Sequence, residues 1–473
     1  MHKVPPEAIW SQIWALIPVF MNVFMMGAQN GWLPNAIYLI LSGQAFHATA
    51  AECALMASFS EFGRIVFAIP AGILADKFGR KKMIICVAIS HFFAWVGVSF
   101  STSMVTIYMA RFVLGIATAL VNSTSLSSIG EIASPEIRGQ LTSVYQIFMS
   151  VGVILPAIIS AAFSLYNALA WGITFFSVIN VLSLIWVTET PSFLISESKF
   201  KQAKQVLRQI RRGYRDSEID TEFEKLKKYI EAEKANKNKS SLIQFFKSKS
   251  IRKPLITGVL INFFSIMTGG IILRVYSTGI YPDNEYVPKR FFPLINQILA
   301  LTMALSTTFY IDKFSRRGIF IFGAVVMGST NAICAFTNYF YLEQNIEYIF
   351  KWVFVIGNLL SVLCYGATIQ PMNSAIKSEL YPQVVKGLCG SLGVISQASS
   401  TVLSYQLFNI IKNHFHIYFM YVVLSMNCAI LGLIVYFLLP EGRGASLTDV
   451  QMQFQEEPAA DCDSVTVKKY DQK

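Results

Sequence analysis

Apolar runs of about 20 residues recur along nearly the whole chain, and short polar turns separate them. A run of this length is enough for an α-helix to cross a lipid bilayer. The pattern predicts an all-α polytopic membrane protein with twelve transmembrane helices. The expected spans cover 14–33, 52–75, 83–101, 104–127, 140–163, 168–188, 254–280, 290–312, 318–341, 348–375, 384–411 and 416–439.

Composition supports a membrane location. Only 14% of the 473 residues are charged, against about 25% in an ordinary soluble chain. The net charge of +11 comes from Lys and Arg in the turns after the second and eighth spans and in the long middle loop. Basic loops stay in the cytoplasm, so we expect a multi-pass plasma membrane protein with both termini inside. The charge therefore needs no nucleic-acid partner.

Three polar signatures occur twice, in the same order. Asp76-Lys-Phe-Gly-Arg-Lys81 is matched by Asp312-Lys-Phe-Ser-Arg-Arg317, and Glu131–Gly139 is matched by Glu379–Gly387. Glu189 after the sixth span and Glu441 after the twelfth form the third pair. The offsets of 236, 248 and 252 positions are nearly constant, which predicts two homologous six-helix halves with a substrate site between them.

The repeat suggests four segments. Residues 1–188 and 254–440 would each form a six-helix bundle. The loop 189–253 is rich in Lys, Arg and Glu and shows helical spacing after Phe200 and Phe223, which predicts short amphipathic helices. The tail 441–473 is polar and expected to be cytoplasmic.

Glu61, Arg64 and Arg274 are charged residues inside expected spans that need an explanation. Glu61 and Arg64 lie one helical turn apart, and Arg274 lies toward the outer end of the seventh span. A charge within a membrane is a functional hypothesis by default. The alternative is that Glu61 and Arg64 only neutralise each other in a helix contact, and that Arg274 extends to the interface. Both interpretations stay open.

Enzymatic chemistry is not indicated. The chain shows no set of nucleophile and base and no cluster of metal ligands, so we expect no catalytic residue, metal or cofactor.

The motifs resemble those of the sugar porter family of the major facilitator superfamily. The matching pieces are Gly72–Lys82, Arg111–Gly115, Glu131–Gly139, Gln146, Glu189–Pro191, Tyr276-Ser277, Asp312–Arg317, Glu379–Tyr381 and Pro440–Gly444. Gly31–Asn35 is similar to the arthropod branch of facilitated trehalose transporter-like proteins. The resemblance implies facilitative uniport of a hexose or trehalose by alternating access, with a monomer sufficient for transport. A different small solute, or a non-transporting nutrient receptor, remains the alternative.

The resemblance also implies a cytoplasmic gate of charged residues at the helix ends of both halves. Its expected members are Asp76, Arg80, Arg111, Glu131, Arg138, Glu189, Asp312, Arg316, Arg317, Glu379, Lys386 and Glu441.

The expected sugar site departs from the family pattern. The usual glutamine pair of the seventh span is replaced by Ser265 and Ile266, and the usual tryptophan of the tenth span is absent. Gln146 and the amide of Gln397 are retained. Proton symporters of the family place an aspartate in the first span, where this chain has Gln29 and Asn30. The candidate substrate-binding residues are Gln146, Gln397, Asn262, Ser265, Thr268, Asn296, Gln297, Gln370 and Asn373.

Overall fold

The computed structural model describes residues 5–237, 249–281, 287–310, 315–344, 347–373 and 386–439, and no strand occurs among them. The long helices are α1 (Pro6–Leu41), α2 (Ala50–Phe78), α3 (Arg80–Ser99), α4 (Met104–Ile132), α5 (Arg138–Phe163), α6 (Tyr166–Ser183), α11 (Lys249–Met267), α14 (Phe292–Tyr310), α15 (Arg316–Gln344), α16 (Glu347–Cys364), α18 (Lys386–His414) and α19 (Ile417–Leu438). Ten spans in the described part are long and apolar enough to cross a membrane. With α14 and α18 at the other two expected positions, the all-helical membrane fold is confirmed.

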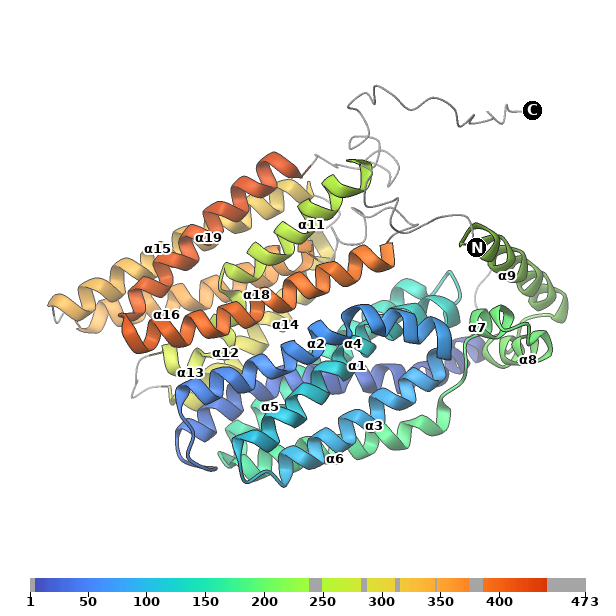
Figure 1. Ribbon diagram of the computed structural model, residues 1–473, viewed down its shortest axis with the longest axis horizontal. Coiled ribbons are helices and arrows are strands. Elements are labelled where there is room, and N and C mark those ends of the chain that lie inside the picture. The colour runs from blue at the N-terminus through green and yellow to red at the C-terminus, as the bar shows by residue number, and fades with distance from the viewer. Residues whose placement is uncertain are drawn as a thin grey trace.

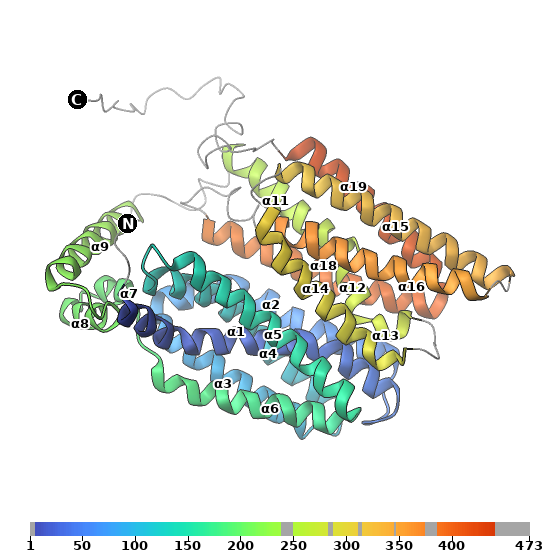
Figure 2. The same ribbon diagram turned by 180° about the vertical axis from the view of Figure 1, so that it is seen from behind.

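The two halves repeat one packing scheme. In the first half α1 packs on α5, α2 on α4 and α3 on α6; in the second α11 packs on α18, α14 on α16 and α15 on α19. Figures 1 and 2 show the halves as two adjoining bundles, blue to green and yellow to red. The halves meet where α2 lies along α18 and where α5 lies along α14. Equivalent helices of the two halves therefore form the interface.

Glycines bring the helices of the first half unusually close. A Cβ at Gly31 of α1 would overlap the carbonyl of Val153 on α5, and one at Gly115 of α4 would overlap the carbonyl of Ser60 on α2. Small residues let helix backbones approach closely where the bilayer itself provides no hydrophobic drive for association. The α1–α5 and α2–α4 contacts are therefore fixed by residues that lack a side chain.

The seventh predicted span is divided into three helices. After α11, Gly269 adopts φ 101°, and the chain continues as α12 (Gly270–Val275) and α13 (Ser277–Ile280). Glycine takes this left-handed conformation without the steric cost of a Cβ. The tenth span also departs from a regular α-helix, because α16 continues into the π-helical turn η3 (Tyr365–Ile369). Such turns are frequent at functional sites.

In the sequence, the halves are separated by three further helices, α7 (Pro191–Ser196), α8 (Phe200–Ile210) and α9 (Asp216–Lys237), which lie at one end of the first half (Figure 1). α8 and α9 cover the positions after Phe200 and Phe223, and the amphipathic character expected there stays a prediction. Arg211 fastens them to the first half: it is 3% exposed, donates to the carbonyl of Ile132 at 2.8 Å and pairs with Glu222 at 2.9 Å. The exact boundaries of the four segments remain predictions, and the tail 441–473 lies outside the described residues.

Candidate functional site

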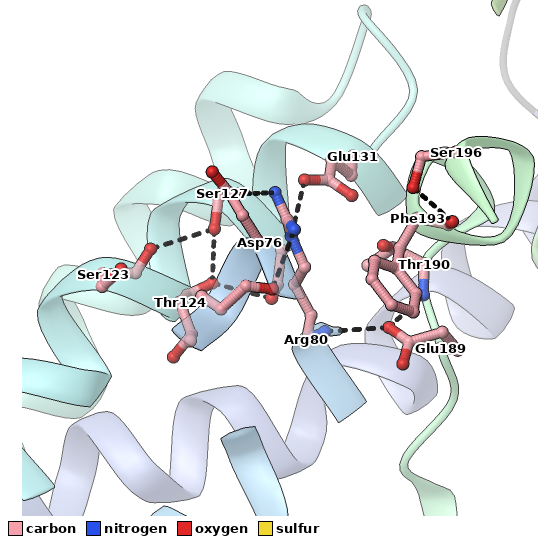
Figure 3. A network of polar contacts seen from close by, with 12 residues as sticks. Asp76, Arg80, Ser123, Thr124, Ser127, Glu131, Glu189, Thr190, Phe193 and Ser196 are labelled. Atoms are coloured by element: carbon pink, nitrogen blue, oxygen red, sulfur yellow. Dashed lines mark hydrogen bonds and ion pairs between the residues drawn. The ribbon is translucent and has the colours of Figure 1, made fainter. Parts of the chain in front are cut away.

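The turn between α2 and α3 gathers four of the predicted gate residues, which we call the turn cluster: Asp76, Arg80, Glu131 and Glu189 (Figure 3). Gly79 makes the turn with φ 89°. Directly after it, the guanidinium of Arg80 contacts Asp76 at 3.3 Å and Glu131 at 3.0 Å. Arg80 also donates to the carbonyl of Ala75 at 3.1 Å, so it caps the last turn of α2.

Glu189 caps the start of α3 from the opposite side. Its Oε1 accepts the backbone N–H groups of Arg80 at 3.0 Å and Lys81 at 3.2 Å, and that of Thr190 at 3.0 Å. The first N–H groups of a helix have no partner within the helix, and the positive end of the helix dipole favours an anion there. Glu189 therefore joins the end of the sixth span to the start of the third.

Arg111 does not belong to the turn cluster, contrary to the prediction. It lies on α4 twenty residues before Glu131, which corresponds to ~30 Å along a helix that rises 1.5 Å per residue. Its Nε donates to the carbonyl of Met56 at 3.4 Å, and its Cζ lies 5.7 Å from the centre of the Trp32 ring. A charge near the start of a helix that runs toward the turn cannot reach the turn at the far end of that helix.

The other predicted gate residues are placed as follows. Arg138 is exposed at the start of α5, and Arg316 begins α15. Arg317 donates to the carbonyl of Tyr436 and stacks 4.8 Å from the centre of its ring, within the second half. Asp312, Glu379 and Glu441 lie outside the described residues, and the side chain of Lys386 is not described either.

The predicted substrate residues fall into a buried and a more open group. Asn262 and Thr268 are buried and bonded within α11 and the turn after it, to the carbonyls of Gly258 and Ser265, both at 2.7 Å. Gln146 and Gln370 are exposed, and Gln397 is half-buried. The remaining predicted residues are all buried: Ser265, Asn296, Gln297 and Asn373.

Gln29 holds three helices together in the first half. Its amide nitrogen donates to Ser60 Oγ on α2 at 2.7 Å, and its amide oxygen accepts from Thr118 Oγ1 on α4 at 3.1 Å. All three side chains are buried. One residue further along α2, Glu61 pairs with Arg64 at 3.2 Å, so the charges expected one turn apart do meet.

Among the described residues, two hydrogen bonds join the halves at the end away from the turn cluster. Gln406 on α18 donates to Ser58 Oγ on α2 at 2.9 Å, and Arg290 before α14 donates to Ser164 Oγ after α5 at 2.8 Å. Ser58 stands 21 positions before Gly79, about 30 Å along the helix. In this arrangement the halves are therefore fastened far from the α2–α3 turn.

Two six-helix repeats that share an interface define a membrane transporter of the major facilitator fold. Residues 12–454 match the sequence profile described as Sugar (and other) transporter. The chain belongs to that family.

The curated relatives agree with this assignment, and a solved structure agrees with the fold. The chain is 23% identical to the glucose transporter GlcP of Staphylococcus epidermidis, over 92% of this chain and 96% of the relative. It is 21% identical to the facilitated trehalose transporter Tret1 of Apis mellifera ligustica, over 96% and 90%. Among solved structures, the inward-open form of the xylose transporter XylE of E. coli superposes with a TM-score of 0.73 at 17% identity, covering 94% of this chain and 99% of that one.

Proposed function

We propose that the protein is a facilitative sugar transporter, a uniporter of hexose or trehalose that works by alternating access of its two halves. Membership of the sugar transporter family supports the substrate class. The names of the relatives, a glucose transporter and a facilitated trehalose transporter, support the two candidate sugars. The symmetric contacts of α2 with α18 and of α5 with α14 at the interface support rocking of one half against the other.

Uniport rests on one observation, the network around Gln29. This amide of the first span is engaged by Ser60 on α2 and Thr118 on α4, and an amide does not titrate. The neighbouring carboxylate of Glu61 is already engaged by Arg64. The buried groups that connect α1, α2 and α4 at this level therefore hold the helices together rather than carry a proton.

Uptake by proteoliposomes tests this function. We expect labelled glucose or trehalose to equilibrate across the membrane and not to accumulate. An imposed pH gradient or a protonophore should leave the initial rate unchanged. The Gln29→Asp variant is the matched comparison, because it places a titratable group at the same position. Accumulation by the unaltered protein that collapses on addition of a protonophore would contradict uniport.

We infer further that the turn cluster faces the cytoplasm and forms the first-half part of an inner gate in the plasma membrane. The position of the basic turns supports this orientation. The hydrogen bonds between the halves at the other end, and the likeness to the inward-open form of XylE, support a state that is open on the turn side.

Gln146 is proposed as a principal sugar contact, with Gln397 and the other polar candidates around it. An amide both donates and accepts hydrogen bonds, as sugar hydroxyl groups require. Gln146→Leu should weaken sugar binding about two- to ten-fold, as expected for loss of one bond worth ~0.5–1.5 kcal/mol. Gln140→Leu, at an exposed position earlier on α5, is the control. Equal affinity for both variants would exclude Gln146 from the site.

A further inference from the structure

Tyr405 of α18 shares a buried cluster with Trp32, which Arg111 faces, and its ring lies 6.0 Å from that of Tyr276, two residues after Arg274. Tyr405 is buried and lies in the electrostatic field of Glu61, Arg64 and Arg111 from the first half and of Arg274 from the second. We call these five residues the central cluster. The cluster forms where α2 packs along α18, at the boundary that alternating access must open and close.

Two arginines of the central cluster are incompletely paired among the described residues, whereas the Nε of Arg274 donates to the carbonyl of Gly270 at 3.1 Å. Arg111 is 3% exposed, and its Nη1 atom has no hydrogen-bond partner among the described residues. The Nε atom of Arg64 is also buried without a partner in that part of the chain. A guanidinium presents five N–H groups and is always charged, so each unpartnered group is a donor available to an acceptor.

Aromatic rings make up part of the surroundings. The Cζ of Arg111 lies 5.7 Å from the centre of the Trp32 ring, and that of Arg274 lies 5.4 Å from the centre of the Tyr365 ring. Cation–π contacts of this kind offset part of the cost of burying a cation. They leave the charge itself uncompensated, because a ring carries no net charge.

Charge balance within the described residues is therefore unequal, with three guanidinium groups around a single carboxylate, that of Glu61. Buried charges are normally paired. An anion that binds here would restore the balance and accept from the unpartnered N–H groups. The planar guanidinium fork suits the two oxygens of a carboxylate or phosphate.

We infer that the central cluster binds the anionic group of a charged sugar, a hexose that carries a carboxylate or a phosphate at one end. The inference rests on the proposed function, because the hydroxyl-bearing part of the ligand is taken to be a sugar. Arg274 would reach the anion from the second half while Arg64 and Arg111 hold it from the first. Bound ligand would thus connect the halves across their interface.

Competition binding tests this inference. Full-length protein in nanodiscs would be titrated with glucuronate and glucose, which differ only in a carboxylate in place of a hydroxymethyl group. We expect glucuronate to bind at least ten-fold more tightly than glucose. Glucose 6-phosphate and inorganic phosphate, run in parallel, separate carboxylate from phosphate and a charged sugar from a free anion.

Two substitutions with opposite expected effects on glucuronate binding distinguish a binding role from a merely structural one. Arg274→Gln should weaken glucuronate binding at least ten-fold and glucose binding less than three-fold. Glu61→Gln removes the competing carboxylate and should strengthen glucuronate binding three- to ten-fold. Arg212→Gln, at an exposed loop position, is the control and should change neither ligand. Arg274→Lys keeps the charge and provides a folded variant if the glutamine variant fails to assemble.

Each other outcome overturns the inference. Equal losses for glucose and glucuronate in Arg274→Gln would make the arginine structural. Inorganic phosphate that competes as well as glucose 6-phosphate would mean that a free anion suffices. Glucose transport without any preference for glucuronate would overturn the inference and leave the proposed function intact. If neither sugar binds or moves, the proposed function fails as well.

Discussion

Arg80 shows how much one side chain does at a helix boundary. It pairs with Asp76 and Glu131 and caps the carbonyl of Ala75, while its own backbone N–H is capped by Glu189. The side chains of Arg80 and Glu131 are each 17% exposed, so their pairing is only partly screened by solvent. The end of α2, the start of α3 and the end of α4 are thereby joined through one residue.

The stability of the protein should depend more on the carboxyl oxygen atoms of Glu189 than on its charge. Glu189→Ala removes the acceptor for three N–H groups and should destabilise the protein by about 1.5–3 kcal/mol. Glu189→Gln keeps an acceptor and loses mainly the interaction with the helix dipole, about 0.3–1 kcal/mol. Apparent melting temperatures in detergent should fall in that order, with exposed Glu197→Ala as the control. An unchanged melting temperature for Glu189→Ala would contradict the cap.

The residue scale also shows where sequence reasoning succeeds and where it fails. Of the expected gate residues, Asp76, Arg80, Glu131 and Glu189 do lie together, because they stand next to helix ends. Sequence reasoning from the motifs succeeds for these four. It fails for Arg111, which was grouped by motif although helix length places it far from the turn. Tyr405 had no distinguishing signal, since an aromatic residue in an apolar span is usually only packing.

At the scale of elements, the contact between α2 and α4 depends on glycine. A Cβ at Gly115 would overlap the carbonyl of Ser60, whereas one at Gly130, on the same helix, meets nothing within 4 Å. Gly115→Ala should therefore cost ~1–3 kcal/mol through overpacking, and Gly130→Ala should be neutral or stabilising because alanine favours a helix. The monodisperse fraction in size-exclusion chromatography checks this prediction. Equal monodisperse fractions for the two variants would show that α2 and α4 can move apart without cost.

Element boundaries were partly predictable. Apolar run length is sufficient to place all twelve spans, because each must cross the same thickness of bilayer. The break at Gly269 and the π-helical turn after Cys364 were not foreseen, since both preserve an apolar sequence while they change the backbone. Local conformation within an apolar run is decided by packing, such as the Tyr365 ring that lies where a Cβ of Gly270 would be.

At the scale of the whole molecule, the repeat of three short signatures is matched by the packing. The three helix pairs of the first half recur as three equivalent pairs in the second. The internal symmetry was predictable because each half must bury equivalent faces. The relative position of the halves was not, since both states of a rocking transporter are compatible with one sequence.

The hydrogen bond between Gln406 and Ser58 should favour the present arrangement of the two halves over the alternative one. Gln406→Leu or Ser58→Ala removes a bond worth ~0.5–1.5 kcal/mol, which shifts the population of the present state by up to about ten-fold. Spin labels at exposed Lys82 and Arg252, in a background without Cys86, should then report more of the short distances at the turn side. Exposed Asn413→Ala on α18 is the control. Distance distributions that match those of the unaltered protein would show that this bond does not hold the state.

The cap on α3 also sets an order of events during synthesis. Glu189 is the last residue of the turn cluster to leave the ribosome, after six spans have been made. Until then, the first N–H groups of α3 lack the carboxylate that later accepts them. Because domains generally fold N-terminal first during translation, we expect the first bundle to close before α11, which begins at Lys249, is made. On this expectation, the second half assembles on the surface of a first half that has already folded.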